Sequence, residues 1–351
     1  MDKIAAAGAQ TYVPVDSDFR LKNNADEIAL DSNFAAQGFW RDVFIRYIRK
    51  TSAVVGFFLI VIISIMAIIG PGMNDYTYSG QELSQKNLAP RVPGVEKTGF
   101  LDGSETMNTT TGSKKVNYYE EKELDDVYYW FGSDNFGRDI WTRTWTGARV
   151  SLIIAIAAAI IDMLIGMSYG LISGYYGGKT DLIMQRCLEI ANGIPRLVVV
   201  TLLLLILQPG MITIIIALML TEWIGMSRIA RAEMLKLKEQ EFVLASRTLG
   251  AGSFFIIFKE ILPNIIGPII TQVMFSIPTA IFTEAFLSFV GLGIPVPQCS
   301  LGSLISEGFN SFTTHPYQII PPIVVMALLM LSFNLVADGM REALDPKMKE
   351  M

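Results

Sequence analysis

Few side chains in this sequence are of types that do covalent chemistry or bind a metal. The chain has one histidine, His315, and two cysteines, Cys187 and Cys299, which fall in different segments without the spacing of a metal site. We therefore predict no disulfide framework, no metal site and no catalytic nucleophile–base pair. The sequence indicates a protein that is not an enzyme and binds no cofactor of its own.

One short run, Gly178-Lys179-Thr180, ends like a phosphate-binding loop. That motif requires its first glycine at position 173, which is Ser173 here, and it follows a strand that this sequence does not predict. An ATP site on this chain is therefore rejected.

Acidic side chains within apolar segments are the remaining candidates. An ion-driven carrier would use such acids as proton or sodium sites. The acids are Asp162, Glu189, Glu222 and Glu284. Carriers of that class normally show internal repeats with paired broken helices, and none is visible in this sequence. A membrane scaffold or sensor would need an output domain, for which the predicted cytoplasmic tails are too short.

Membrane-spanning helices must position these side chains. Of all residues, 51% are hydrophobic and 17% are charged, and several apolar runs approach the roughly 20 residues that a spanning helix needs. The net charge of −5 says little about partners, because the charges are unevenly placed. The composition predicts a polytopic membrane protein, and we expect no nucleic-acid partner.

The N-terminal tail, residues 1–51, is polar and lacks a cleavable signal pattern, and the first transmembrane helix is predicted over 52–70. Arginines and a lysine crowd the start of this helix, which places the N-terminus in the cytoplasm. Within the tail, Trp40 to Arg49 has the pattern of an amphipathic helix on the membrane surface.

Residues 71–149 are predicted to be external. Up to about Trp130 we expect a small, partly ordered lobe, because the segment is too long for a turn and is rich in polar residues. From Phe131 to Leu152, tryptophans share a helical face flanked by arginines. This pattern predicts an interfacial helix at the headgroup level before the chain enters the membrane.

Residues 150–340 are predicted to form a core of five transmembrane helices, with a cytoplasmic loop over 231–263 and a cytoplasmic tail over 341–351. With the first helix, the charges assign six spans and place both ends of the chain in the cytoplasm. The five core spans run approximately over Ser151–Ile172, Asp181–Leu207 (broken by Pro195), Met211–Ile229, Ile265–Val290 and Ile319–Val336.

A ladder of glycines, each four residues after the last, ends the second span. This spacing places the missing side chains on one helix face, where a neighbouring backbone can approach closely. The ladder comprises Gly166, Gly170, Gly174 and Gly178.

The cytoplasmic loop carries a helix–turn–helix pattern. A short helix is predicted from Glu241 to Leu249, with Phe242 and Ala245 on the same face as Leu249. Glycine accepts the left-handed conformation that ends helices, so Gly250 is predicted to stop this helix. Ser253 is then predicted to cap a second helix that Pro263 closes. A short exposed helix between membrane spans suits a groove on another protein.

This loop resembles the cytoplasmic coupling loop of ABC importer permeases, whose signature is Glu-Ala-Ala-x-x-x-Gly followed by Ile-x-Leu-Pro. The matching residues are Ala245, Gly250, Leu262 and Pro263. Leu244, Ser246 and Glu260 occupy the remaining signature positions. By this resemblance, the residues that couple to an ATPase are Glu241, Ala245, Ser246, Leu249, Gly250 and Ala251.

Two further patterns carry the resemblance. Gly132 to Asp139, followed by Gly147 to Leu152, resembles a signature of the peptide and nickel branch of these permeases. Asn334 to Lys347 is similar to the C-terminal pattern of the same family. The three patterns occur in the family's order, and the chain resembles the C-type permease subunits of oligopeptide ABC importers.

The resemblance implies an all-α integral membrane fold of six transmembrane helices, the type I ABC importer permease fold. It also implies four kinds of partner: a second homologous permease, two cytoplasmic ABC ATPases that bind ATP and magnesium, an external peptide-binding lipoprotein or periplasmic protein, and the lipid of a bacterial cytoplasmic membrane. The chain would form half of an oligopeptide pathway that works by alternating access. Dipeptide or nickel import stays open as an alternative.

Glu284, Pro278 and Glu222 are the predicted pathway residues. Counted from Ile265 at about 1.5 Å per residue, Glu284 lies about 30 Å along its helix, near the outer edge of the hydrocarbon. Pro278 removes a backbone donor and is expected to bend this helix toward the cavity. We hypothesise that Glu284 meets the amino end of an incoming peptide. The alternative is that it pairs with a donor of the partner permease.

Topology is testable by single cysteines in a background without Cys187 and Cys299. Cysteines at Glu96 and Ser303 are expected to react with an impermeant maleimide in intact cells, because both positions are predicted to be external. Cysteines at three internal positions are expected to stay unlabelled until the cells are broken. These positions are Lys22, Glu239 and Lys347. Labelling at Glu239 in intact cells contradicts the six-span topology.

Overall fold

The computed structural model describes residues 39–99, 101–109 and 112–344. Lys22, Lys347 and the end of the C-terminal family pattern lie outside the described residues, as does most of the N-terminal tail. The amphipathic helix predicted in that tail is present as α1 (Phe39–Arg49). Its placement on the membrane surface stays a prediction.

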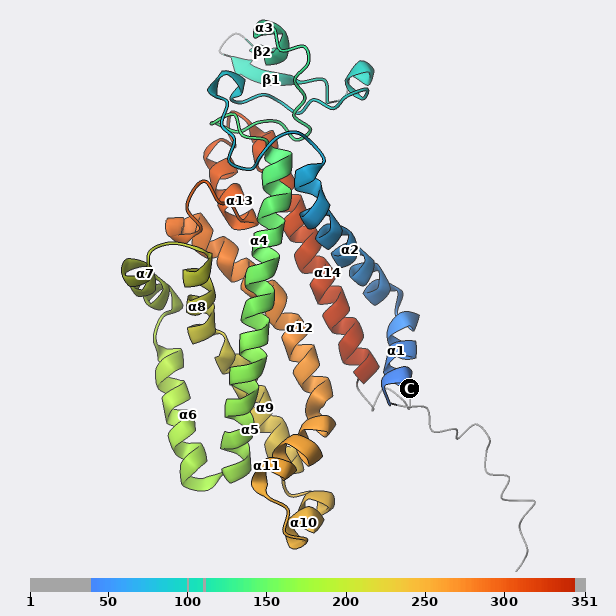
Figure 1. The fold of residues 1–351 in the computed structure, drawn as a ribbon, viewed down its shortest axis with the longest axis vertical. Coiled ribbons are helices and arrows are strands. Elements are labelled where there is room, and N and C mark those ends of the chain that lie inside the picture. The colour runs from blue at the N-terminus through green and yellow to red at the C-terminus, as the bar shows by residue number, and fades with distance from the viewer. Residues whose placement is uncertain (1–38, 100, 110–111, 345–351) are drawn as a thin grey trace, which may run out of the picture. The chain divides into compact units, whose positions relative to one another are not determined.

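Helices make up most of the described chain (Figure 1). The helices after α1 are α2 (Thr51–Ile69), α3 (Tyr118–Glu121), α4 (Ile140–Ile161), α5 (Met167–Tyr176), α6 (Gly178–Gly193), α7 (Arg196–Leu207), α8 (Met211–Thr221), α9 (Trp223–Leu237), α10 (Glu241–Thr248), α11 (Ser253–Phe255), α12 (Leu262–Leu287), α13 (Leu301–Asn310) and α14 (Ile320–Leu344). Three π-helical segments, η6 (Asp162–Gly166), η7 (Ile256–Ile261) and η8 (Ser288–Leu292), continue their neighbouring α-helices.

Five helices are long and apolar enough to cross a membrane, and α6 with α7 forms a sixth candidate that is bent by 78°. The five run over Thr51–Gly72, Ile140–Tyr176, Met211–Leu237, Ser253–Leu292 and Pro316–Leu344. The predicted fold of six spans with a break in the third is therefore confirmed. The bend falls at Ile194 and Pro195, where the backbone is extended and no longer helical.

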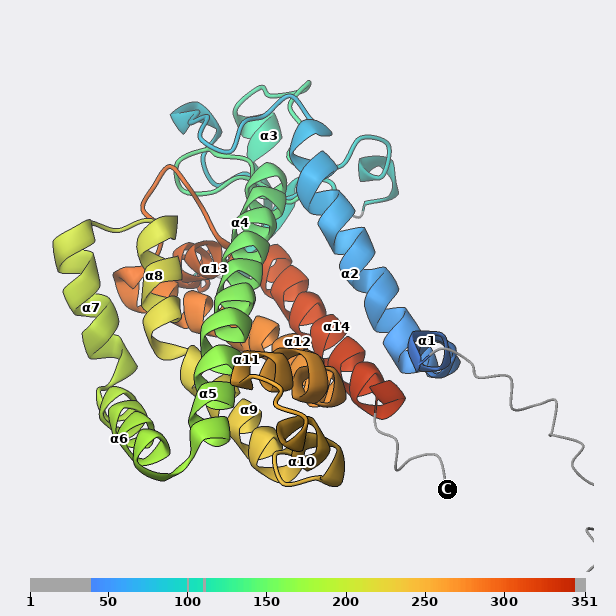
Figure 2. The ribbon, with the colours of Figure 1, turned by 60° about the horizontal axis from the view of Figure 1, so that its bottom comes forward.

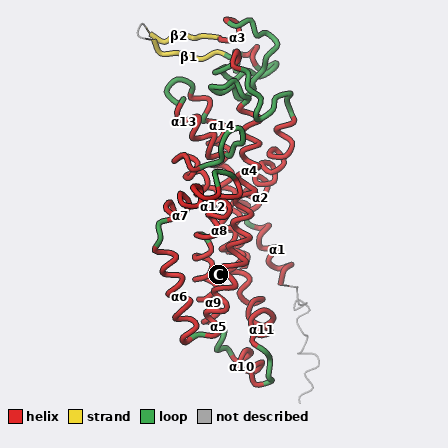
Figure 3. The backbone as a smooth tube through the Cα atoms, turned by 60° about the vertical axis from the view of Figure 1, so that its left-hand side comes forward, coloured by secondary structure: helices red, strands yellow, loops and turns green. Residues whose placement is uncertain are grey.

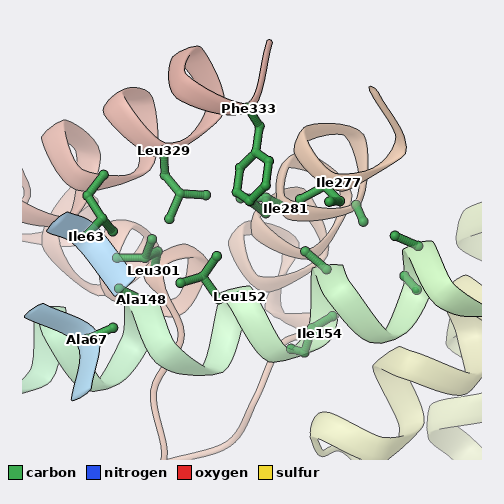
Figure 4. Close-up of a cluster of buried hydrophobic side chains, with 14 of the residues drawn as sticks. Ile63, Ala67, Ala148, Leu152, Ile154, Ile277, Ile281, Leu301, Leu329 and Phe333 are labelled. Atoms are coloured by element: carbon green, nitrogen blue, oxygen red, sulfur yellow. The ribbon is translucent and has the colours of Figure 1, made fainter. Parts of the chain in front are cut away.

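Four of these helices, α2, α4, α12 and α14, pack side by side, as Figures 1 and 2 show from two directions. Their buried side chains form one apolar cluster, in which Leu152 of α4, Ile281 of α12 and Phe333 of α14 converge (Figure 4). Small residues such as Ala148 and Ala155 keep α4 close to its neighbours. In lipid this close packing of shapes is what holds helices together, because lipid tails are as apolar as the side chains.

The glycine ladder forms a second packing surface, between α5 and α9. A Cβ on Gly166 or Gly174 would lie 2.7 Å and 2.8 Å from the Cβ atoms of Met226 and Met234 of α9, respectively. A Cβ on Gly170 would lie 2.8 Å from the backbone nitrogen of Arg231. The two helices therefore touch along their backbones.

The prediction for the fourth ladder position, Gly178, is wrong. No heavy atom lies within 4 Å of the place its Cβ would take. The chain turns at Gly177, whose φ is +64°, so Gly178 begins α6 instead of extending α5.

The lobe that is predicted to be external contains the only strands of the described chain, β1 (Ser104–Thr109) and β2 (Gly112–Asn117), which pair as an antiparallel hairpin. At the base of the hairpin, Leu88, Tyr119 and Tyr129 form a small apolar core. Figure 3 shows this hairpin and α10 at opposite ends of the helical body. The all-α prediction thus holds for the spanning part, whereas the lobe is stabilised by strand pairing.

Two predicted boundaries are wrong. No separate interfacial helix precedes the second span, because α4 begins at Ile140 and runs without a break to Ile161. Pro263 does not close the helix that follows Gly250. It lies inside the continuous helix from Ser253 to Leu292, just after the π-helical segment η7. Gly252, rather than Ser253, is the residue at the N-cap.

The labelling position Ser303 is also unsuitable, because it is only 9% exposed and forms a capping box with Ser300 at the start of α13. Asn310, at the other end of this helix, is exposed and replaces it in the topology experiment.

Replacement of Gly170 by valine is expected to destabilise the packing of α5 on α9 by about 1–3 kcal/mol, the usual cost of forcing extra methyl groups into a packed interface. The measurement is thermal unfolding of the purified complex in detergent. Gly193→Ala is the matched control, because nothing lies within 4 Å of its Cβ position and its φ is not positive. Equal unfolding temperatures for the two variants would show that α5 and α9 are not held in close contact.

Candidate functional site

The predicted coupling residues surround a sharp turn at one end of the molecule. Helix α10 ends at Thr248, and Gly250 adopts φ = +83°, the left-handed conformation expected of a glycine that stops a helix. The N–H of Gly250 donates to the carbonyl of Arg247 at 3.0 Å, and the N–H of Ala251 donates to the carbonyl of Ser246 at 3.0 Å. The turn is thus closed by its own backbone.

Helix α10 faces outward with most of its surface. Only Val243 is fully buried, where it joins the apolar cluster beneath α10. Glu241, Ala245 and Gly250 are exposed, and Leu249 is 88% exposed. Ser246 and Ala251 are half-buried.

Apolar side chains dominate the exposed surface at this turn. Besides Leu249, Leu244 is 48% exposed and Phe254 is 75% exposed. Clustered exposed apolar side chains at the end of a helix are typical of a surface that another protein covers.

The turn is tied directly to a spanning helix. After Gly252 the chain enters α11, η7, α12 and η8, which together form one helix of 40 residues from Ser253 to Leu292. Ile256, Ile257 and Ile261 on η7 bury themselves in the same cluster as Met226 and Met234 of α9. The turn is therefore continuous in the chain with the helix that contains α12.

One face of α12 remains uncovered over much of its length. We call this face the α12 stripe; it consists of Gln272, Phe275, Thr279, Phe282 and Phe286, which are exposed or half-buried at three- and four-residue spacing. Two cavities lie along it. The first, of about 720 Å³, is lined by Gln272 and Phe275 with charged groups of α9 and α14. The second, of about 280 Å³, is lined by Phe275, Thr279 and Phe282.

The pathway prediction for Glu284 is wrong. Its side chain is 0% exposed and accepts hydrogen bonds from Ser151 of α4 at 3.0 Å and from Ser288 at 2.8 Å. The residue lies on the side of α12 opposite the stripe, so it meets neither the pathway nor a partner permease. Counting residues along α12 predicts the depth of Glu284 but not the direction in which its side chain faces.

The other two predicted pathway residues lie nearer the stripe. Pro278 is buried within α12 but contributes to the wall of the 280 Å³ cavity. Glu222 stands at the break between α8 and α9 and pairs with Arg196 at 2.7 Å.

A buried ionic cluster that the sequence did not predict lies at the N-terminal end of α4. Asp134 accepts from Arg138 Nε at 2.7 Å and from Arg143 Nη1 at 2.5 Å. Glu307 Oε2 of α13 accepts hydrogen bonds from Arg138 Nη2 and from Arg143 Nη1, each at 2.7 Å. Both arginines are essentially unexposed, so they do not flank the helix at the headgroup level as predicted.

This ionic cluster explains the second family pattern. Asp139 caps α4 by accepting from the N–H of Thr142 at 2.8 Å, and burial raises the pKa of Asp139 against the opposing effect of this bond. Asp134 and Arg138 lie four residues apart, and that charge spacing was the one available signal of an internal pair. Nothing in the sequence indicated Glu307 as their partner.

Comparison with known proteins agrees with this geometry. The sequence matches the family model described as "Binding-protein-dependent transport system inner membrane component" over residues 166–350. It also matches the model of the "N-terminal TM domain of oligopeptide transport permease C" over residues 38–90.

Three relatives span nearly the whole chain. The oligopeptide transport system permease protein OppC of Bacillus subtilis (strain 168) is 42% identical over 311 residues, covering 89% of this chain and 90% of the relative. The dipeptide transport system permease protein DppC of the same organism is 39% identical over 326 residues, covering 93% and 90%. OppC of Escherichia coli (strain K12) is 30% identical over 327 residues, covering 93% and 96%.

Replacement of Asp134 by alanine leaves two buried guanidinium groups sharing one carboxylate. Breaking a buried pair from one side costs about 3–5 kcal/mol, so a large loss of thermal stability is expected. Glu189→Ala is the control, because it removes one partner of an exposed pair with Arg186, which is worth about 0–1 kcal/mol. Similar unfolding temperatures for both variants would show that the cluster does not clamp α13 to α4.

Proposed function

Because the chain belongs to the family of binding-protein-dependent transport system inner membrane components, we propose that it is the C-type transmembrane subunit of an ATP-driven oligopeptide importer. The chain forms half of the translocation pathway and performs no covalent chemistry itself. The observation that carries the proposal is the exposed turn at Gly250, which is continuous with the helix that bears the α12 stripe.

The proposed assembly contains partners of four kinds. A second, homologous permease covers the α12 stripe and completes the pathway. Two ABC ATPases bind ATP and magnesium, and the α10 turn docks in a groove on one of them. An external peptide-binding lipoprotein or periplasmic protein delivers the substrate to the end that carries the β-hairpin. The complex lies in a bacterial cytoplasmic membrane, with both ends of this chain in the cytoplasm.

Transport follows from the mechanical continuity of α10, the Gly250 turn and α12. Closure of the ATPase dimer on ATP draws the docked turns of the two permeases together. Because Ser253 to Leu292 is one helix, this movement tilts the α12 stripe and changes which end of the pathway is open. Helices α5 and α9 move together with α12, because η7 packs into the same apolar cluster as α9.

Dipeptide import is the second candidate, and it is favoured by the 39% identity to a dipeptide permease. Oligopeptide and dipeptide importers differ in the length of peptide that the pathway and the external receptor accept. An ion-driven carrier has less support, because Glu284 is buried with its hydrogen bonds made inside the chain.

The docking role is tested by replacing Gly250 with aspartate. A Cβ at φ = +83° costs roughly 1–2 kcal/mol, and a charged side chain opposes burial of the neighbouring apolar groups. We expect the variant complex to reach the membrane but to lose its ATPase subunits, or to hydrolyse ATP with peptide uptake reduced at least tenfold.

Gly252→Ala is the matched control in the same turn. Its φ is −71° and nothing lies within 4 Å of its Cβ position, so uptake and subunit content are expected to stay normal. Normal peptide uptake by Gly250→Asp would rule out docking through this turn.

A further inference from the structure

Arg196 occupies an unusual place for a charged residue. It is the first residue of α7, directly after the 78° bend, and its side chain is 42% exposed. The 16 residues of α6 separate it from the turn at Gly177 by about 24 Å of helix. An arginine at such a depth is costly in lipid, by about 2.5–3.5 kcal/mol, so its exposed side faces protein or water.

The guanidinium is held in place from one side. Arg196 Nη1 lies 2.7 Å from Glu222 Oε1 and donates to Thr283 Oγ1 at 3.1 Å. Glu222 stands at the break between α8 and α9, and Thr283 lies on α12. The group is therefore anchored to three different elements.

The opposite edge of the guanidinium is free. Within the part of the chain that the structure describes, Nε and Nη2 of Arg196 make no hydrogen bond, although each carries N–H donors. Two such nitrogens side by side match the two oxygens of a carboxylate, and this bidentate pairing is among the strongest hydrogen-bonded contacts in proteins. The pair with Glu222 fixes the orientation of this fork in advance.

Arg196 contacts α12 at Thr283, one helical turn beyond Thr279 of the α12 stripe. Thr283 neighbours Phe282 in the chain and donates to the carbonyl of Thr279 at 2.8 Å, and both of these residues line the 280 Å³ cavity. The carboxylate of Glu222 lies beside the arginine and pairs with it. A ligand at the fork therefore does best if it also carries a positive group, as a zwitterionic peptide does.

We propose that Arg196 is a substrate contact in the pathway and binds the C-terminal carboxylate of the transported peptide, with Glu222 as the positioning residue that orients its guanidinium. This inference rests on the proposed function as a peptide permease. It names the side chain that binds the carboxylate of the substrate, and family membership alone does not name that side chain.

The experiment measures uptake of penta-alanine and of its C-terminal amide by the complete complex in proteoliposomes, below saturation. The wild type is expected to take up the free acid at least tenfold faster than the amide. Arg196→Gln is expected to bring this ratio close to one by slowing uptake of the acid alone. Arg196→Lys keeps the charge without the fork, so an intermediate ratio is expected.

Two further variants separate binding from a structural role. Glu222→Gln keeps the guanidinium but removes the charge that orients it, so the ratio of acid to amide uptake is expected to fall below the wild-type value and to stay above one. Arg186→Gln is the control on the same segment, because Arg186 is exposed and pairs with Glu189 on α6, and its ratio is expected to equal that of the wild type.

If Arg196→Gln and Glu222→Gln each slow the uptake of acid and amide equally, the inference is overturned. The ion pair would then only stabilise the two helix breaks or contact the second permease. Uptake of acid and amide at equal rates by the wild type would also overturn the inference, while leaving the proposed function intact. Uptake of neither peptide by the wild type would instead refute peptide import, and with it this contact.

Discussion

Inside a membrane, a charged side chain must find its partner within the protein, and this constraint accounts for much of the present structure. At the external end, Asp134, Arg138 and Arg143 neutralise one another together with Glu307 and so clamp α13 to α4. Deeper in the molecule, Glu284 takes its hydrogen bonds from serines of two elements. The helices pack closely at these points because the polar groups leave no alternative.

Backbone contact replaces side-chain packing between α5 and α9. Gly166, Gly170 and Gly174 bring α5 against α9 along three turns of helix. Near the inner end of this contact, Arg231 makes two hydrogen bonds of 2.6 Å to Asp181 of α6. Because small residues give the closest approach and the bidentate pair fixes the register, α5, α6 and α9 form a stiff support beside the coupling turn.

The long helix from Ser253 to Leu292 begins directly after the turn at Gly250. It contains prolines at positions 268 and 278 and two π-helical segments, η7 and η8. Such interruptions free backbone groups and allow local bending, and they frequently occur at functional sites. The helix is therefore continuous over its length and contains defined points at which it can bend.

Local features of the chain were predictable from the sequence. Apolar length indicated the spans, Pro195 indicated the break in the third, and the glycine at position 250 indicated a left-handed turn, because each depends on the preferences of residues close together in the chain. The same holds for the face shared by Gly166, Gly170 and Gly174, which helical spacing alone determines.

Only the tertiary structure decided which side chains meet. Glu284 faces inward to Ser151, and Glu307 contacts Arg138, which lies 169 positions earlier in the chain. Arg196 and Glu222, each at a helix break, form an ion pair. The tertiary structure also removed Gly178 from the glycine face and paired the strands of the external hairpin. A helical pattern specifies which residues share a face, but the direction of that face depends on how distant helices pack, and no spacing within one segment contains that information.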